Sequence, residues 1–395
     1  MRRLGAGSNS TLESHIVKTH RLVRTLIAPG ILALCLVAGK ASAQYVQNNL
    51  VSDIPGLATV TDSRLVNPWG ISYAPTGPFW ISDAGSGLTT LYNGAGTPQS
   101  LVVTIPGPGG GAPSVPTGQV FNTAAGSGAF NGDLFIFAGA TGVITGWRGA
   151  LGTNAEILAN NSATGASYLG VAVGTVGANN YLYAANFGNG RIDVLPAAGA
   201  SPIAGSFLDP SLPAGYAPFN IQNVGGSLFV TYALVGSDGD EVKGAGLGFV
   251  NRFDLNGNLV SRFASNGVLD APWGLARAPT TGFGAFSGDL LVGNFGDGTI
   301  NAFNFATGAF HGTLTDLSGN PIVNEGLWGI TFGNGANAGR TDTLYVAAGI
   351  RDETHGLFAA ISSVPEPSTV GVFAGLGLLG LCAAARWRSR NRAVA

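Results

Sequence analysis

The sequence predicts an all-β protein, a six-bladed β-propeller between an N-terminal signal helix and a C-terminal transmembrane helix. Three observations lead to this fold class. A pattern of about fifty residues returns six times, the body over 44–361 has no long stretch of helical period, and each end carries an apolar run with basic neighbours. Several short strands per repeat, repeated six times, are typical of a propeller because each blade is one small antiparallel sheet.

Each repeat opens with a short apolar strand marked by a small residue, as in "NPWGIS" at 67 and "APWGLA" at 271. The marked positions are spaced 48, 52, 50, 54 and 55 residues apart and are Gly70, Gly118, Gly170, Asn220, Gly274 and Gly329. A second strand, a Gly-rich turn and a third strand follow, as in "YLYAANFGNGRIDVL". The alternation and the N-G and D-G turns indicate hairpins. We expect the marked residues to surround the axis, where a missing side chain permits close backbone approach.

The sixth repeat supplies only three strands, "LWGITF", "TLYVAAG" and "GLFAAI". The segment "QYVQNNLVSDI" at 44–54 precedes the first repeat and has no partner there. We therefore expect this segment to pair with the last blade, which would close the ring and protect both sheet edges. The repeats are similar to those of NHL-like six-bladed propellers. A seven-bladed ring with one degenerate blade and a pair of β-sandwiches are the alternatives.

The N-terminal residues 1–43 have the organisation of a secretory signal. A long basic region precedes an apolar core over 26–38, and small residues follow at Ala41 and Ala43. This pattern predicts a signal helix and cleavage before Gln44. An uncleaved N-terminal anchor is the alternative.

The C-terminal residues 362–395 combine three parts in order. An extended Pro-rich segment comes first, then an uncharged run over 370–385 that would form a helix of roughly 24 Å, and then Trp387 with four arginines. A buried core helix with a basic end is the alternative. The Pro-rich segment consists of Val364, Pro365, Glu366, Pro367 and Ser368.

These three parts resemble a PEP-CTERM sorting signal. The resemblance implies that an exosortase-type protease cleaves near Pro365–Pro367, in a Gram-negative bacterium. It also implies a precursor anchored in the inner membrane by its C-terminal helix, and a mature protein at the cell surface or outside the cell. The stretch "LVSDIPGLATVTDSRLVNPWG" at 50–70 resembles an uncharacterised group of exported proteins with such tails, which implies fold and export alone.

The composition of the body excludes several classes of function. Both cysteines, Cys35 and Cys382, lie in the targeting segments, so thiol catalysis and thiolate metal sites are excluded. His311 and His355 are the two histidines of the body, which rules out a multi-histidine centre in one chain. Nine Lys and Arg against nineteen Asp and Glu outside the two ends give a net charge of −10, which repels nucleic acid.

Propeller topology places the start of each first strand and the turn after each second strand on one face. We predict a ligand face there. Three tryptophans hold equivalent repeat positions and favour packing between blades, or an aromatic platform for sugars. Three amide or carboxyl residues hold equivalent turn positions and favour local hydrogen bonds. The predicted ligand face comprises Trp69, Trp273, Trp328, Asp83, Asn186, Asn294, Asp352 and His355.

Two charged loops fall on the same predicted face. In "GSDGDEVKGAG" at 236–246, Asp238, Asp240 and Glu241 are oxygen ligands of the kind that Ca²⁺ takes, although the rest of an EF-hand loop is missing. A solvated hairpin tip is the other interpretation. In "GIRDETHG" at 349–356, His355 beside carboxylates suits a general base, or simply a polar turn.

Two hypotheses of function follow from different classes. The first is a non-catalytic surface module that binds an extracellular polysaccharide or a surface protein, supported by the sorting signal and by the absence of a strong catalytic motif. The second is a metal-centred hydrolase or lactonase, an activity that other six-bladed rings host and that fold analogy supports weakly. Its candidate axial ligands are Asn67, Asn220, Asn324 and Glu325.

Overall fold

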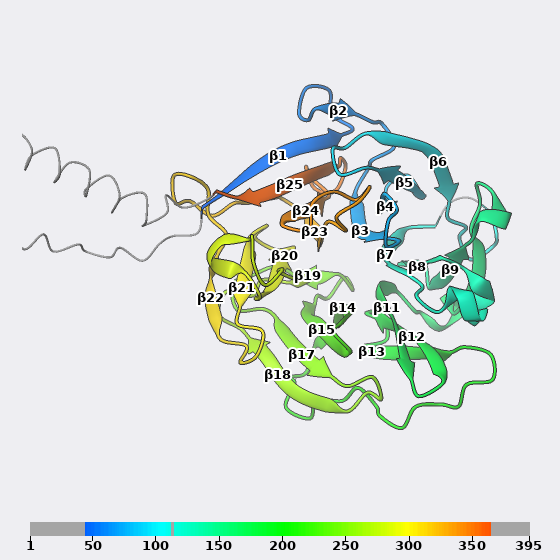
Figure 1. The fold of residues 1–395 in the computed structure, drawn as a ribbon. Helices are drawn as coiled ribbons and strands as arrows, with labels where there is room; N and C mark the ends of the chain where they lie inside the picture. Colours follow the sequence, from blue (N-terminus) through cyan, green and yellow to red (C-terminus); the bar gives the residue numbers. More distant parts are fainter. Residues whose placement is uncertain (1–43, 112–113, 365–395) are drawn as a thin grey trace, which may run out of the picture. The chain divides into compact units, whose positions relative to one another are not determined.

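The computed structural model describes residues 44–111 and 114–364, and these residues form a six-bladed β-propeller (Figure 1). Six antiparallel sheets surround one axis, and their innermost strands contact one another in a closed series. The series runs β3, β7, β11, β14, β19, β23 and back to β3. Six sheets rule out a seventh blade, and the closed ring rules out a pair of sandwiches.

Blades 1 to 3 contain the eleven strands from β3 to β13. Blade 1 comprises β3 (Pro68–Tyr73), β4 (Phe79–Asp83), β5 (Leu88–Tyr92) and β6 (Pro98–Thr104). Blade 2 comprises β7 (Pro116–Phe121), β8 (Phe135–Gly139), β9 (Val143–Trp147) and β10 (Glu156–Asn160). Blade 3 comprises β11 (Tyr168–Val176), β12 (Asn179–Asn186) and β13 (Arg191–Pro196).

Blades 4 to 6 complete the ring. Blade 4 comprises β14 (Tyr216–Val224), β15 (Ser227–Val235), β17 (Phe249–Phe253) and β18 (Leu259–Ser265), with the short β16 (Glu241–Val242) also paired to β15. Blade 5 comprises β19 (Pro272–Arg277), β20 (Leu290–Asn294), β21 (Ile300–Phe303) and β22 (Phe310–Thr313). Blade 6 comprises β23 (Leu327–Phe332), β24 (Thr343–Ala348), β25 (Leu357–Ser363), β1 (Tyr45–Ser52) and β2 (Val60–Thr61).

Helical structure in the described ranges is confined to five short 3₁₀ turns. They are η1 (Ala125–Ser127), η2 (Ala129–Gly132), η3 (Gly149–Leu151), η4 (Ser162–Thr164) and η5 (Gly284–Phe286). Within 44–111 and 114–364, no helix has the length and apolar character needed to cross a bilayer. The signal helix and the sorting helix predicted from the sequence lie outside the described residues.

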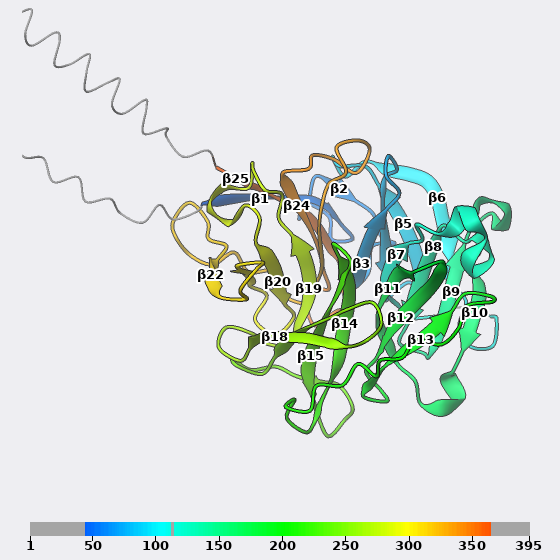
Figure 2. The same cartoon turned by 60° about the horizontal axis from the view of Figure 1, so that its bottom comes forward.

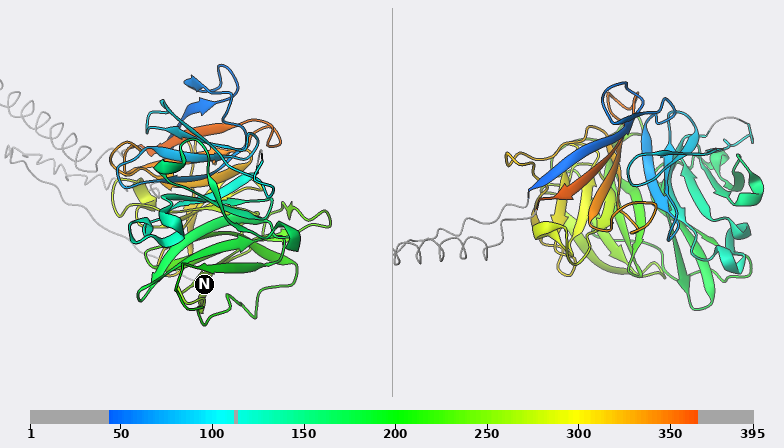
Figure 3. Two further views of the ribbon diagram at one scale, coloured as in Figure 1. Left: turned by 90° about the vertical axis from the view of Figure 1, so that its right-hand side faces the viewer. Right: turned by 45° about the horizontal axis from the view of Figure 1, so that its top comes forward.

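The N-terminal strand closes the ring, as the sequence predicts. Strand β1 runs antiparallel to β25, with Tyr45 opposite Ser363 and Ser52 opposite Leu357 (Figures 2 and 3). The Tyr45 ring is fully buried against Phe283 and Phe286 of blade 5, and its hydroxyl donates to the Phe283 carbonyl oxygen over 3.0 Å. Closure therefore joins the two ends of the domain through backbone pairing and a buried aromatic anchor.

The ring of small residues predicted from the repeat is also confirmed. A Cβ atom built on Gly70 would lie 2.6 Å from the Thr117 carbonyl oxygen, and one on Gly118 would lie 2.7 Å from the Gly170 Cα. The blades thus meet through their backbones, because the space for a side chain is absent. Asn220 is the exception in this ring, and its Nδ2 donates to the Trp273 carbonyl oxygen over 2.8 Å, linking blade 4 to blade 5.

The hydrophobic core lies mainly between neighbouring blades. Ile136 and Ile144 of blade 2, for example, belong to one buried cluster with Val171 and Leu182 of blade 3. Each sheet therefore buries both of its faces against its neighbours, which explains why the second strands are almost wholly apolar. Because the blade faces are buried against one another, we expect a binding site along the central axis.

Candidate functional site: the central cavity and its aromatic plug

A layer of large side chains closes the central channel where the inner strands begin. We call Gly70 and its five equivalents in the repeats the ring residues. The residue just before each ring residue points toward the axis region, and five of these six residues are apolar and buried. They are Trp69, Leu169, Phe219, Trp273 and Trp328, with the polar Thr117 in blade 2. We call this layer the plug and this end of the propeller the plug face.

Stacking between rings holds the plug together. The Trp328 indole is fully buried, with its centroid 3.3 Å from that of Trp69 and 3.9 Å from that of Phe295, both in stacked geometry. Trp273 meets Trp69 and Trp328 edge to face, at 6.0 and 5.9 Å. Such arrangements are favourable for aromatic quadrupoles. The three tryptophans therefore perform the packing role that the sequence favoured, and they present little surface to solvent.

The other predicted ligand-face residues of the second strands are buried at the ends of β4, β12 and β20. Asn186 accepts from the Ser167 amide over 3.2 Å and donates to Asp193 Oδ2 over 2.7 Å. Asn294 Nδ2 donates to the Val268 carbonyl oxygen over 2.7 Å. These amides connect their own turn to a neighbouring segment, which matches the structural interpretation of the sequence.

Asp83 differs from these amides because it is a carboxyl group. It is fully buried, and burial raises its pKa well above the ordinary value. The Thr90 hydroxyl donates to Asp83 Oδ2 over 2.8 Å, whereas Asp83 Oδ1 has no hydrogen-bond partner among the described residues. Burial therefore favours the protonated form of this side chain.

The two charged loops predicted from the sequence do meet above the plug. Asn67 Nδ2 donates to Glu353 Oε2 over 2.8 Å, and Asn67 Oδ1 accepts from the Trp69 indole over 3.0 Å. Burial raises the pKa of Glu353, and burial with repulsion from Glu353 raises the pKa of Glu241 to about 7. Lys243 Nζ lies 4.2 Å above the Phe295 ring and offsets part of this charge.

The second charged loop, residues 349–356, contains strained backbone. Arg351, Asp352 and Glu353 have φ of 56°, 52° and 62°, a left-handed conformation that non-glycine residues rarely adopt in succession. The Asp352 amide donates to Glu325 Oε1 over 3.1 Å, and Asp352 itself is exposed. This turn directs Glu353 inward and Asp352 toward solvent.

His355 pairs with a carboxylate from outside its own loop. Its Nδ1 lies 2.6 Å from Asp53 Oδ2, and the Gly356 amide donates to Asp53 Oδ1 over 2.8 Å. Asp53 follows the closing strand β1, so this pair fastens the closure of blade 6. A catalytic role for His355 stays a prediction.

Of the predicted calcium ligands, Asp238 and Asp240 lie on an exposed hairpin tip, whereas Glu241 is half-buried in β16. Asp238 Oδ1 accepts from the Asp240 amide over 3.3 Å, and the Gly236 amide donates to the Asp240 carbonyl oxygen over 2.7 Å. Within the described ranges, no group of three or more His, Cys, Asp or Glu is arranged to hold a metal ion. Calcium stays a prediction from the sequence.

The axial ligands suggested for a metal-centred enzyme are each engaged elsewhere. Asn220 bonds to the Trp273 carbonyl oxygen and the Ile221 amide, and Asn324 exchanges two bonds with Gln47, of 2.8 and 2.9 Å. Asn67 bonds to Glu353, as described above. These contacts leave no converging set of oxygen ligands on the axis among the described residues.

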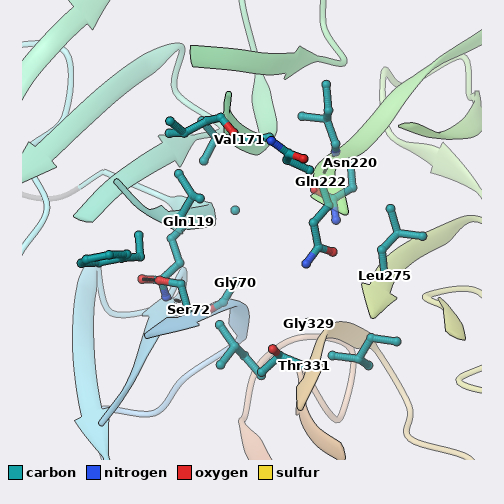
Figure 4. A pocket seen from close by; sticks show the side chains of 18 of the residues that line it. Gly70, Ser72, Gln119, Val171, Asn220, Gln222, Leu275, Gly329 and Thr331 are labelled. Carbon is teal, nitrogen blue, oxygen red and sulfur yellow. Dashed lines mark hydrogen bonds between the residues drawn. The ribbon is translucent and has the colours of Figure 1, made fainter. Parts of the chain in front are cut away.

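A cavity of about 460 Å³ lies on the other side of the plug, along the axis (Figure 4). Ring residues and Trp273 form its inner end, and the later residues of the inner strands form its walls. Exposure to solvent rises along these strands, from buried Gly70 to half-buried Tyr73 and from buried Asn220 to half-buried Asn223. The cavity therefore opens where the inner strands end, on the face opposite the plug, which we call the open face.

The polar side chains of the cavity are hydroxyls and carboxamides. Gln119 Nε2 donates to the Gly70 and Trp80 carbonyl oxygens over 2.8 Å each, and its Oε1 accepts from the Ser72 hydroxyl over 3.2 Å. The Gln222 carboxamide makes no hydrogen bond to another described residue, and Thr331 lies across the cavity from it (Figure 4). The described residues that line the cavity include no Asp, Glu, His, Lys or Arg.

Sequence reasoning missed this cavity because it looked for charged groups on the opposite face. A signal was present, since the residue two positions after the ring residue is polar in three blades: Ser72, Gln222 and Thr331. Alternation along a strand places that residue on the same side as the ring residue, and all three of these polar residues line the cavity.

Comparisons with known proteins found one matching family model and several similar proteins. Residues 363–390 match the model of the PEP-CTERM protein-sorting motif. The motif is recognised by exosortase, and it implies export and sorting as a membrane-anchored precursor. Among solved structures, the soluble aldose sugar dehydrogenase of Escherichia coli is 14% identical, with a TM-score of 0.48 over 81% of this chain and all of that one. Virginiamycin B lyase from Staphylococcus aureus is 12% identical, with a TM-score of 0.45 over 82% of this chain and all of that one.

Two viral proteins are similar along most of the propeller. The uncharacterized protein R648 of Acanthamoeba polyphaga mimivirus is 33% identical over 298 residues, which cover 72% of each chain. The uncharacterized protein L690 of the same virus is 31% identical over 305 residues, which cover 74% of this chain and 79% of that one. The present chain belongs to the protein family that includes these two mimivirus proteins.

Proposed function

We propose that this protein is a surface binding module, in which the open-face cavity holds a unit of a neutral, hydroxyl-rich polymer such as an extracellular polysaccharide. The observation that carries the proposal is the uncharged, amide- and hydroxyl-bearing lining of a cavity of about 460 Å³. Pockets for small ligands typically measure about 300–1,000 Å³ and combine apolar walls with a few polar groups. Carboxamides and hydroxyls both donate and accept, as recognition of sugar hydroxyls requires.

The same lining argues against catalysis in the cavity. Hydrolysis of a glycosidic or ester bond needs a general acid or base, or a metal held by carboxylates or imidazoles. The described lining residues offer none of these groups. The acidic outer surface, with a net charge of −10 outside the targeting segments, further disfavours a polyanionic ligand.

Export places this module outside the cytoplasm. We propose that cleavage before Gln44 and processing near Pro365–Pro367 yield a mature protein at the cell surface of a Gram-negative bacterium. Mass spectrometry of the mature protein tests this directly. A protein that retains either targeting segment after export contradicts it.

Binding is tested with the mature protein on a glycan array, followed by calorimetry with the best neutral glycan. Replacing Gln222 by leucine removes the free carboxamide of the cavity and keeps a side chain of similar length. We expect about tenfold weaker binding, since losing one hydrogen bond in a partly buried site costs roughly 1–1.5 kcal/mol. The matched control is Gln99→Leu on the outer strand β6, whose Nε2 donates to the Thr97 carbonyl oxygen.

Two results would contradict the proposal. Equal losses in both variants would show that the cavity is not the site. Release of shortened glycan by the wild-type protein would make it an enzyme instead of a binding module.

A further inference from the structure

The sorting motif begins inside the folded propeller. The matched region starts at Ser363, which is the last residue of β25 and lies opposite Tyr45 in the closing pair. The next residue, Val364, donates its amide to the Gln44 carbonyl oxygen over 2.9 Å. Ser363 Oγ also donates to the Gly282 carbonyl oxygen of blade 5 over 3.0 Å. Sheet pairing therefore continues to the residue directly before Pro365.

One loop of the propeller covers this junction. Residues 314–324, which we call the junction loop, form most of the connection between β22 and β23. The Tyr45 amide donates to the Thr315 carbonyl oxygen over 2.9 Å, and Gln44 Nε2 donates to the Leu317 carbonyl oxygen over 3.1 Å. In Figures 1 and 2 this yellow-orange loop lies beside the start of β1 and the end of β25.

The junction loop exposes apolar side chains that the fold does not need. Leu317 and Val323 are 57% and 58% exposed, among the most exposed large hydrophobic residues of the described ranges. Residues 314–324 carry one charge, on Asp316, whose Oδ1 accepts from the Ser318 and Asn320 amides within the turn, and Glu325 adds a second charge directly after them. An exposed apolar surface with little charge is typical of an interaction site.

The distance to the processing site is short. Three residues separate Pro367 from Val364 in the sequence, and three fully extended residues span at most about 11 Å. An enzyme that grips the Pro-Glu-Pro segment must therefore meet the surface around the junction. Leu317 and Val323, together with Val46 of β1, are the large apolar side chains exposed near this junction.

We propose that the junction loop is a second recognition surface for the exosortase, which contacts Leu317 and Val323 while its active site holds the sorting motif. The folded and closed propeller is then the substrate, since the loop is positioned by β1. This inference rests on the sorting motif and is independent of the ligand proposed for the cavity.

The test uses the full-length precursor expressed with its exosortase, and follows loss of the C-terminal segment by pulse-chase labelling. We expect the double variant Leu317→Glu, Val323→Glu to be processed about tenfold more slowly than the wild type. The matched control is Val260→Glu on β18, because Val260 is 55% exposed but lies on blade 4. Thermal unfolding of each variant establishes that the fold is retained, as expected for exposed side chains.

Three outcomes would overturn the proposal. Unchanged processing of the double variant, or equal slowing by Val260→Glu, would show that the loop is not recognised. Flotation of the mature wild-type protein with phosphatidylethanolamine–phosphatidylglycerol vesicles, lost in the double variant, would assign the loop to the bilayer and not to the enzyme.

Discussion

Replacing Gly329 by alanine tests the ring of backbone contacts around the axis. An ideal Cβ on this residue would lie 2.3 Å from the Trp69 carbonyl oxygen, whereas real Cβ atoms are essentially never closer than 3.0 Å to a neighbour. Blades 1 and 6 would have to separate locally by at least 0.7 Å, the difference between 3.0 and 2.3 Å. The obstacle is backbone, so no rotamer change can relieve it.

The expected cost is at the upper end of the roughly 1–3 kcal/mol that overpacking a core usually requires. Unfolding entropy of about 2.1 cal/mol/K per residue over roughly 320 residues gives ~0.7 kcal/mol/K, so ~3 kcal/mol corresponds to a Tm lower by about 4–5 °C. Differential scanning calorimetry at neutral pH measures this shift. Trp69 and Trp328 belong to the plug, so intrinsic fluorescence should change in parallel.

The matched control is Gly149→Ala. Gly149 opens the surface turn η3, and a Cβ built on it would meet no atom within 4 Å. Its Tm should stay equal or rise slightly, because alanine restricts the unfolded chain. Equal Tm values for the Gly329 and Gly149 variants would refute the claim that the blades are in backbone contact at the axis.

Three further predictions concern buried groups. Burial raises the pKa of Asp83, so the folded state holds its proton more tightly than the unfolded state, and the stability from this group is lost as pH rises through its folded pKa. Asp83→Asn should therefore raise Tm increasingly as the pH of thermal melts rises above the ordinary carboxyl pKa, and an unchanged pH profile would refute this. Glu241 behaves with the same sign between its ordinary pKa and about 7, so Glu241→Gln should flatten the decline of Tm over pH 5–7, against Asp238→Asn at the exposed tip as the control. Tyr45→Ala removes a fully buried ring from the closing strand and should lower the free energy of urea unfolding by about 3–5 kcal/mol. Tyr45→Phe loses one hydrogen bond and should lower it by about 0.5–1.5 kcal/mol. Equal losses would show that the ring does not anchor the closure.

Most of the fold could be predicted from local sequence patterns. Gly70 and its equivalents recur because the axis leaves no room for a Cβ, and that requirement is visible in one chain without coordinates. The pairing of 44–54 with the last blade followed from counting strands and from the cost of an open sheet edge. The Pro-Glu-Pro segment and its neighbours likewise carry their signal in residue order.

The candidate site could not be predicted from the sequence, because its place depends on which end of the central channel is closed by side chains. The sequence predicted Trp69, Trp273 and Trp328 as packing residues or as a sugar platform. In the structure their rings pack against one another in the plug, so they are buried. Gln222 and Thr331 belong to blades 4 and 6 and share a cavity because the ring brings their strands to one axis. No local pattern reports that convergence.

The sequence by itself therefore determined the number of blades, their closure and the sorting motif, because each is encoded in a period or a contiguous segment. Tertiary structure alone decided that the cavity is open opposite the tryptophans, that Glu353 helps to raise the pKa of Glu241, and that Leu317 lies beside the start of the sorting motif. The physical reason is that these properties arise between residues far apart in the chain, where packing against neighbouring blades sets exposure, distance and charge.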